Sequence, residues 1–285
     1  MKGRLLTLAR NLWRHTVPVR VRTRAWELFA RHYFERAALR QMVTRSRAEA
    51  IRQPETLQRL LAILEAHDYR PVTDIIREQL GLDFKGYSAQ DLIAYLYFHG
   101  KPNGFFVDIG AYDGVEISNT WLLEQLGWSG ICIEPIPEIF ALLDRNRNCS
   151  KYNVAVSSLA AGEAGFVKVS ERLGLSGLQQ QMPERIRKGL EKQGLELEQV
   201  TVKTMTFGEI MRNHPQVGLV DFLSIDVEGA ELDVLESIDF ERFRFRLITI
   251  ENNAGRAVLQ DTLERRGYRL FLDLGVDLMF VPVNA

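Results

Sequence analysis

Cysteine is scarce in this chain of 285 residues, which contains only Cys132 and Cys149. They form no CxxC pair and no histidine-rich spacing accompanies them, so the sequence indicates neither a zinc site nor a disulfide framework. Long apolar runs are also missing, because no segment approaches the roughly 20 residues that span a bilayer. No secretory signal is recognisable either. We therefore expect a cytoplasmic protein.

The formal net charge of the whole chain is only −1, but the basic and acidic residues are unevenly distributed along it. Residues 1–52 hold 13 Lys and Arg against 3 Asp and Glu, which leaves 23 against 34 in the remainder. A basic arm before an acidic body suggests an anionic partner, either a membrane surface or nucleic acid. Residues 23–53 have helical periodicity, so this helix could lie on an anionic membrane or pack against the rest of the chain.

The three closely spaced glycines that wrap a dinucleotide pyrophosphate are missing as well. An apolar strand at 105–109 instead runs into Gly110-x-x-x-Gly114, with Asp108 and Asp113 beside the glycines. Two carboxylates disfavour a pyrophosphate but suit a cationic ligand. S-adenosylmethionine carries a sulfonium and an ammonium group and no phosphate, so it is the favoured ligand. An oxidoreductase is the weakest interpretation.

Strands alternate with helices after Gly100, which predicts a mostly parallel sheet. We expect strands at 105–109, 130–134, 152–156, 219–225 and 246–251, then a closing pair at 268–274 and 277–283. The second strand ends at Glu134, where an acid can accept hydrogen bonds from ribose hydroxyls. Residues 160–201 are expected to form a less regular insert, with an extra strand at 163–169 and a mobile loop at 173–181.

Acidic residues also end the later strands. Asp226 and Glu228 follow the strand at 219–225, and Glu251 ends the next one. Clustered acids repel one another, and a cationic cofactor or a metal would relieve that repulsion. Transfer of the methyl group from S-adenosylmethionine would require that the acceptor be positioned and deprotonated by a base. The five histidines are poorly placed for that role, so we expect Asp226 or Glu228 to act as the base with Glu251 as a helper.

Several motifs occur together in a characteristic order: Val107–Gly114, Ser118–Thr120, Leu123-Glu124, Gly127-Trp128, Ile133–Pro135, Asn146-Arg147-x-Cys149, Asn153–Ser157 and Ile225–Glu231. In this order they resemble the FkbM-type methyltransferases, from about Gly104 to the C-terminus. The resemblance implies a Rossmann-like class I S-adenosylmethionine-dependent O-methyltransferase whose seven-stranded, mostly parallel sheet closes with an antiparallel hairpin. It also implies acceptors such as sugar or polyketide hydroxyls. We expect residues 1–98 to form a basic helical region and residues 99–285 the methyltransferase domain.

The residues expected to bind the cofactor follow from these motifs: Asp108, Gly110, Ala111, Tyr112, Asp113, Ser118, Asn119, Glu134, Pro135, Ala155 and Asp226.

Three alternatives stay open. In a less favoured metal-assisted variant, Asp226, Glu251 and Asn252 would hold Mg²⁺, since hard oxygen ligands suit that ion. RNA methylation would use the basic arm of residues 1–52 as its electrostatic footprint. A non-catalytic binding module would keep the fold without transferring anything. We favour O-methylation of a small-molecule, glycan or lipid-linked acceptor, with the basic arm in peripheral contact with a membrane. The sequence does not predict an oligomeric state.

Overall fold

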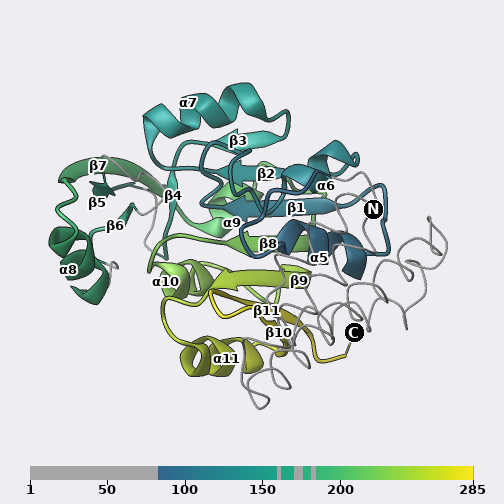
Figure 1. Cartoon of the computed structure of the whole chain (residues 1–285). Coiled ribbons are helices and arrows are strands. Elements are labelled where there is room, and N and C mark those ends of the chain that lie inside the picture. Colours follow the sequence, from purple (N-terminus) through teal and green to yellow (C-terminus); the bar gives the residue numbers. More distant parts are fainter. Residues whose placement is uncertain (1–82, 159–161, 170–175, 181–183, 285) are drawn as a thin grey trace, which may run out of the picture.

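A seven-stranded sheet forms the centre of the protein. The computed structural model describes residues 83–158, 162–169, 176–180 and 184–284. The strand order is β3-β2-β1-β8-β9-β11-β10 (Figure 1). The strands are β1 (Phe105–Ile109), β2 (Ser129–Ile133), β3 (Ser150–Tyr152), β8 (Leu219–Ile225), β9 (Arg244–Glu251), β10 (Tyr268–Asp273) and β11 (Asp277–Pro282).

All neighbouring pairs in this sheet are parallel except those of β11, which runs antiparallel to both β9 and β10. This is the doubly wound arrangement of a class I methyltransferase with its closing hairpin. The predicted fold class is therefore confirmed.

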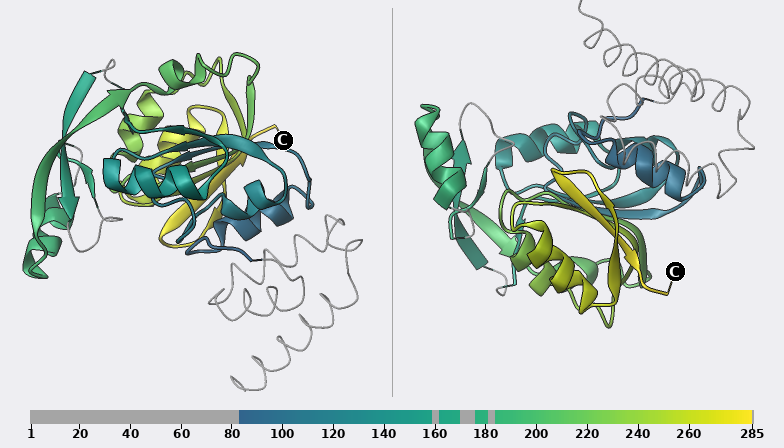
Figure 2. Two further views of the ribbon diagram at one scale, coloured as in Figure 1. Left: turned by 90° about the horizontal axis from the view of Figure 1, so that it is seen from above. Right: turned by 60° about the horizontal axis from the view of Figure 1, so that its bottom comes forward.

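Helices cover both faces of the sheet, as the two views of Figure 2 show. One face packs against α5 (Gln90–Tyr97) and α6 (Trp121–Gln125), with α7 (Pro137–Asn146) beside them. The other face packs against α9 (Phe207–Met211), α10 (Glu231–Glu236) and α11 (Arg256–Glu264). The strands are apolar on both faces because both are buried, which is usual for a parallel sheet.

The first described helix belongs to the core of the sheet. Leu92, Ile93 and Leu96 of α5 are buried against Phe106 and Phe222 of the central strands. The helices and the basic arm expected within residues 1–82 lie outside the described residues. Within the described residues, no helix combines the length and apolarity that a membrane span requires.

A second, four-stranded sheet stands off one end of the main body (Figures 1 and 2). Its order is β4-β7-β5-β6, formed by β4 (Ala155–Val156), β7 (Leu197–Met205), β5 (Gly162–Val169) and β6 (Gly177–Leu178), and α8 (Glu184–Lys192) accompanies it. The extra strand predicted at 163–169 is confirmed as β5, which pairs antiparallel with β7 along eight residues.

The prediction of one continuous strand at 152–156 was wrong. The Asn153 side chain donates hydrogen bonds to the carbonyl oxygens of Glu134 and Pro135, at 2.9 and 3.0 Å. The chain turns there, so β3 ends in the main sheet at Tyr152 and β4 pairs with β7 instead. The insert is consequently more regular than expected, because β6, β7 and α8 were not predicted.

Candidate functional site

One row of the sheet brings the predicted acids together. Ile109, Ile133, Ile225 and Ile250 are register partners across four adjacent strands. The next residues along those strands are therefore neighbours at the carboxyl edge, and they are Gly110, Glu134, Asp226 and Glu251. Ligands bind at this edge in open α/β sheets.

Gly110 has to be a glycine for this row to close. Its φ is +88°, and a Cβ atom there would lie 1.7 Å from the carbonyl oxygen of Asp226. The Asp226 amide in turn donates to the carbonyl of Ile109 at 2.9 Å. Because this position carries no side chain, the row has a gap between Glu134 and Asp226, and a pocket opens above it.

This pocket has a volume of about 810 Å³, including the open solvent at its mouth. Its charged lining side chains are all acidic: Asp108, Glu116, Glu134, Asp226 and Glu228. Phe166, Ser176 and Leu178 of the second sheet and its loop complete the wall. A pocket beyond the carboxyl ends of parallel strands is a usual place for a small-molecule site. Its acidic lining favours a cationic or neutral ligand over an anionic one.

Asp108 is buried at the floor of the pocket. It accepts a hydrogen bond of 2.6 Å from the Thr120 hydroxyl. Burial raises the pKa of Asp108, whereas the bond from Thr120, the charge of Arg147 and a hydrogen bond from Ser224 lower it. The carboxyl group is thus held in place by its neighbours and not by direct ion pairing.

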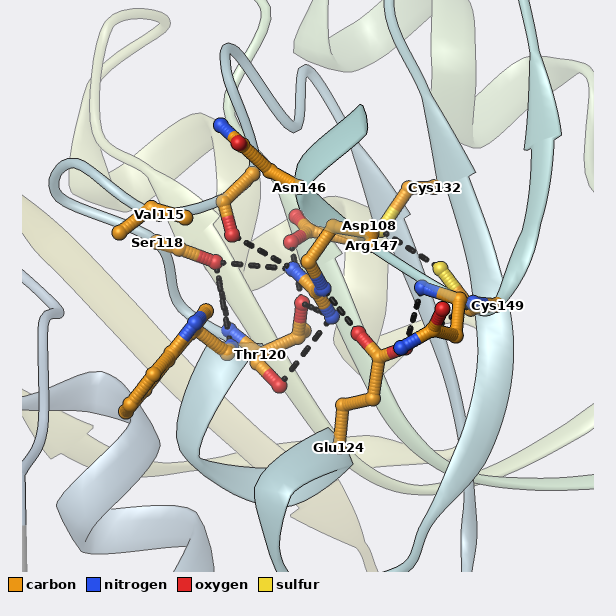
Figure 3. A network of polar contacts seen from close by, with 12 residues as sticks. Asp108, Val115, Ser118, Thr120, Glu124, Cys132, Asn146, Arg147 and Cys149 are labelled. Carbon is orange, nitrogen blue, oxygen red and sulfur yellow. Dashed lines mark hydrogen bonds and ion pairs between the residues drawn. The ribbon is translucent and has the colours of Figure 1, made fainter. Parts of the chain in front are cut away.

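Arg147 organises the loop between β1 and α6 (Figure 3). This side chain is fully buried and pairs with Glu124 through Nε. Its Nη1 donates to the Gly114 carbonyl at 3.0 Å and to the Ser118 hydroxyl at 3.2 Å. Its Nη2 donates to Thr120 Oγ1 at 3.1 Å. One planar guanidinium therefore fixes the backbone and side chains that border the pocket.

Glu134 is 5% exposed, and its Oε1 accepts a hydrogen bond of 2.8 Å from the Ile136 amide. Burial raises its pKa to about 8, against smaller opposing effects of the backbone at Ile136 and Tyr112. A ligand that donates hydrogen bonds to this carboxylate would favour its ionised form. The two hydroxyls of a ribose are donors of this kind.

Asp226, Glu228 and Glu251 form a second acidic cluster, in which one carboxylate oxygen from each lies within 4.8 Å of the others. Burial, reinforced by the neighbouring acids, raises their pKa values to about 7, 8 and 11, respectively. A hydrogen bond between Asp226 and Glu251 lowers the former pKa and raises the latter. These shifts favour the neutral form of Glu251, which donates the hydrogen bond to Asp226.

Most residues predicted to bind the cofactor line the pocket: Asp108, Gly110, Ala111, Tyr112, Ser118, Asn119, Glu134, Pro135, Ala155 and Asp226. Asp113 is not among them, because its Oδ1 accepts the Val115 and Glu116 amides at 2.8 Å. Of the predicted catalytic residues, Glu228 lines the pocket, whereas Glu251 lies behind Asp226.

Sequence reasoning missed several supporting residues. Asp277 is the register partner of Glu251, raises the pKa of Asp226 and accepts a hydrogen bond of 2.6 Å from Gln90. Arg147 was noticed only within a motif. No pattern distinguished Arg147 from Arg145, which precedes it by two residues, and Asp277 is one acid at the start of the last strand.

Comparison with known proteins identifies the family. The model of the methyltransferase FkbM domain matches residues 108–270, more than half of the chain. The chain belongs to the FkbM methyltransferase family. This makes it an S-adenosylmethionine-dependent methyltransferase.

One curated protein and one solved structure show similarity to this FkbM protein. Methyltransferase sdnD of Sordaria araneosa is 27% identical over 198 residues, which span 60% of this chain and 76% of that protein. A TehB-like SAM-dependent methyltransferase from Corynebacterium glutamicum is 12% identical, with a TM-score of 0.36 over 78% of this chain and 98% of that one.

The pocket of the FkbM protein has the chemistry that S-adenosylmethionine needs. Its acidic lining suits a ligand with a sulfonium and an ammonium group. Asn119 is 6% exposed, and its Oδ1 has no hydrogen-bond partner within the described part of the chain. Its Nδ2 is held by the Ser224 hydroxyl at 3.1 Å. A buried acceptor without a partner is costly and fits a site that a donor such as an ammonium group completes.

Proposed function

We propose that the protein transfers a methyl group to a hydroxyl of a small-molecule, glycan or lipid-linked acceptor. S-adenosylmethionine supplies the methyl group on a positively charged sulfur. The single observation that carries the proposal is the carboxylate cluster of Asp226, Glu228 and Glu251, of which Asp226 and Glu228 line the pocket. No histidine or lysine lines this pocket among the described residues, so the carboxylates are the bases available to the acceptor.

The position of each residue suggests its role. Glu134 is proposed to bind the ribose, and Asn119 the ammonium group. Asp226 is the proposed base because it lines the pocket and titrates near neutral pH. Glu251 does not line the pocket, so it acts as a positioning residue that donates a hydrogen bond to Asp226. Glu228 is the second candidate base.

A base with a pKa near 7 suits a hydroxyl acceptor, because the proton has to leave as the new bond forms. The acidic lining also disfavours phosphorylated acceptors, including RNA, whose charge would be repelled. A neutral polyol such as a sugar fits better. The hydroxyls of a sugar could donate hydrogen bonds to the carboxylates that line the pocket.

The metal-assisted variant rests on the same cluster. Asn252 Oδ1 is buried without a partner within the described residues, while its Nδ2 donates to the Gly275 carbonyl at 3.2 Å. Magnesium held by Asp226, Glu251 and Asn252 would lower the pKa of a bound hydroxyl. Turnover that is unchanged by EDTA and by added Mg²⁺ would rule this variant out.

The proposed peripheral contact of residues 1–52 with an anionic membrane has a separate test. Co-sedimentation with phosphatidylserine vesicles should retain the full chain at low salt and release it at high salt. Equal retention on neutral phosphatidylcholine vesicles would contradict it.

The acceptor atom can be determined directly. Cell extracts incubated with purified protein and S-[methyl-¹³C]adenosylmethionine should yield labelled products whose carbon resonance is that of a methyl on oxygen. A methyl carbon attached to nitrogen, carbon or sulfur would refute O-methylation. The D226N variant should transfer at least about 100-fold more slowly while binding S-adenosylhomocysteine, since a general base contributes factors of this order. Turnover of D226N at the wild-type rate would remove Asp226 as the base.

A further inference from the structure

Two free cysteines lie side by side next to the cofactor loop. The Sγ atoms of Cys132 and Cys149 are 3.4 Å apart, as the dashed line in Figure 3 marks. Cys132 is buried in β2, and Cys149 is partly exposed just before β3. A disulfide bond is about 2.05 Å long, so an approach of roughly 1.3 Å would join them. The strand β2 that carries Cys132 pairs with β3, which begins directly after Cys149, and Cys132 lies opposite Lys151.

The two thiols differ in character. The hydrogen bond between the two thiols lowers the pKa of Cys149, and the nearby Arg147 guanidinium lowers it further. Burial raises the pKa of Cys132 well above its usual value. Cys149 is therefore the more reactive thiol, since the thiolate is the nucleophile and the group is partly accessible. Cys132 is placed to act as the resolving thiol.

Cys149 is connected to the cofactor loop through two carboxylate contacts. Its amide and that of Asn148 donate to Glu124 Oε1, at 3.0 and 2.8 Å. The other oxygen of Glu124 pairs with Arg147, which holds the Gly114 carbonyl and the Ser118 hydroxyl. Ser118 lines the pocket. A displacement of Cys149 toward Cys132 would therefore disturb the anchor of this loop (Figure 3).

We propose that Cys132 and Cys149 form an oxidation site, in which a disulfide between them loosens the loop of residues 110–120 and weakens cofactor binding. The oxidant is hydrogen peroxide or an organic hydroperoxide. The Cys149 thiolate attacks the terminal peroxide oxygen, which breaks the O–O bond, forms a sulfenic acid and releases hydroxide from hydrogen peroxide or an alkoxide from an organic hydroperoxide. Cys132 then attacks the sulfenic sulfur, its thiol proton leaves with the displaced hydroxyl group as water, and the S–S bond forms. The effect on binding depends on the proposed cofactor site, whereas the disulfide does not.

The first test uses the full chain, reduced and then treated with hydrogen peroxide. Mass spectrometry should show the loss of two hydrogen atoms and a peptide cross-linked through Cys132 and Cys149. Dithiothreitol should reverse both changes. Overoxidation of Cys149 to a sulfinic acid while Cys132 stays reduced would overturn the proposal, as would a failure of both thiols to react. C149S should lose no hydrogen, and C132A should accumulate the sulfenic or sulfinic form of Cys149.

The second test measures the consequence of oxidation. Hydrogen–deuterium exchange in residues 110–126 should increase in the oxidised wild type, and the Kd for S-adenosylhomocysteine should rise at least about threefold. C149S keeps the amide that Glu124 binds, so peroxide should change neither quantity in this variant. An oxidised wild type whose exchange and Kd equal those of the reduced form would overturn the coupling. If the reduced protein binds no S-adenosylhomocysteine, the proposed cofactor site is refuted. Mass spectrometry and hydrogen–deuterium exchange would still test the oxidation site.

Discussion

The proton on Glu134 provides the sharpest test of the cofactor site. Burial holds its pKa at about 8 in the free protein, so the carboxyl is mostly neutral at pH 6. If ribose hydroxyls bind the ionised carboxylate, binding has to release this proton. Each unit of pH below the pKa then costs about 1.4 kcal/mol of binding free energy. The Kd for S-adenosylhomocysteine should be about 100-fold higher at pH 6 than at pH 9, and about 10-fold higher at pH 7.

The E134Q variant is the matched control. A glutamine can still accept the Ile136 amide at its oxygen, but it has no proton to release. The Kd of E134Q should therefore lack the change of about 100-fold between pH 6 and pH 9 that is expected of the wild type. At pH 9 it should bind roughly 10- to 100-fold more weakly, because a hydrogen bond to a charged group is worth about 1.5–3 kcal/mol.

Isothermal titration calorimetry measures both quantities. Titrations in two buffers with different ionisation enthalpies should show release of close to one proton at pH 6.5 by the wild type. This release should be absent, or reduced by one proton, in E134Q. Any dependence on pH that E134Q retains comes from the ammonium group of the ligand or from Asp108, Asp226 and Glu228, which also line the pocket. Identical pH profiles for the two proteins would refute the role of Glu134.

Three further variants test other parts of the site. G110A should lower the free energy of unfolding by more than about 3 kcal/mol in a denaturant titration, because its Cβ would collide with the Asp226 carbonyl. G208A is the control, because its Cβ meets nothing within 4 Å, and it should be neutral or stabilising. Equal losses of stability in the two variants would contradict the collision. R147K should cost roughly 2–3 kcal/mol by the same measurement, since lysine cannot make the several bonds of the buried guanidinium; a wild-type stability would remove Arg147 as the anchor. The raised pKa of Glu251 stabilises the fold at low pH, and this contribution is lost as pH rises between the ordinary carboxyl value and about 11. E251Q should therefore raise Tm by about 2–4 °C at pH 8 and leave it unchanged at pH 4.5; a gain of the same size at both values would contradict the assignment.

The parallel core was predictable because three of its strands, β2, β8 and β9, are mostly apolar and have an acid at their carboxyl end. Glu134, Asp226 and Glu251 follow the isoleucines that share one row of the sheet. Once the strands are read as parallel, their carboxyl ends have to meet at the same edge. The site follows from that alignment without knowledge of any loop.

The second sheet was harder to predict for a physical reason. Its long strand β7 contains few strongly apolar residues and exposes much of its length to solvent. Its partner β5 ends at Val169, far from Leu197 in the sequence, and no local pattern reveals this pairing. The turn at Asn153 was missed because it depends on two carbonyl oxygens of another strand end. The buried environment of Arg147 likewise depends on Gly114, Ser118 and Thr120, which are distant from it in sequence.

A crystal structure of the protein soaked with S-adenosylhomocysteine tests the central claim most directly. We predict that both ribose hydroxyls lie within hydrogen-bonding distance of Glu134, and that the sulfur lies above the gap at Gly110, beside Asp226. Nucleoside density at any other edge of the sheet, or a Glu134 carboxylate turned away from the ribose, would contradict the account.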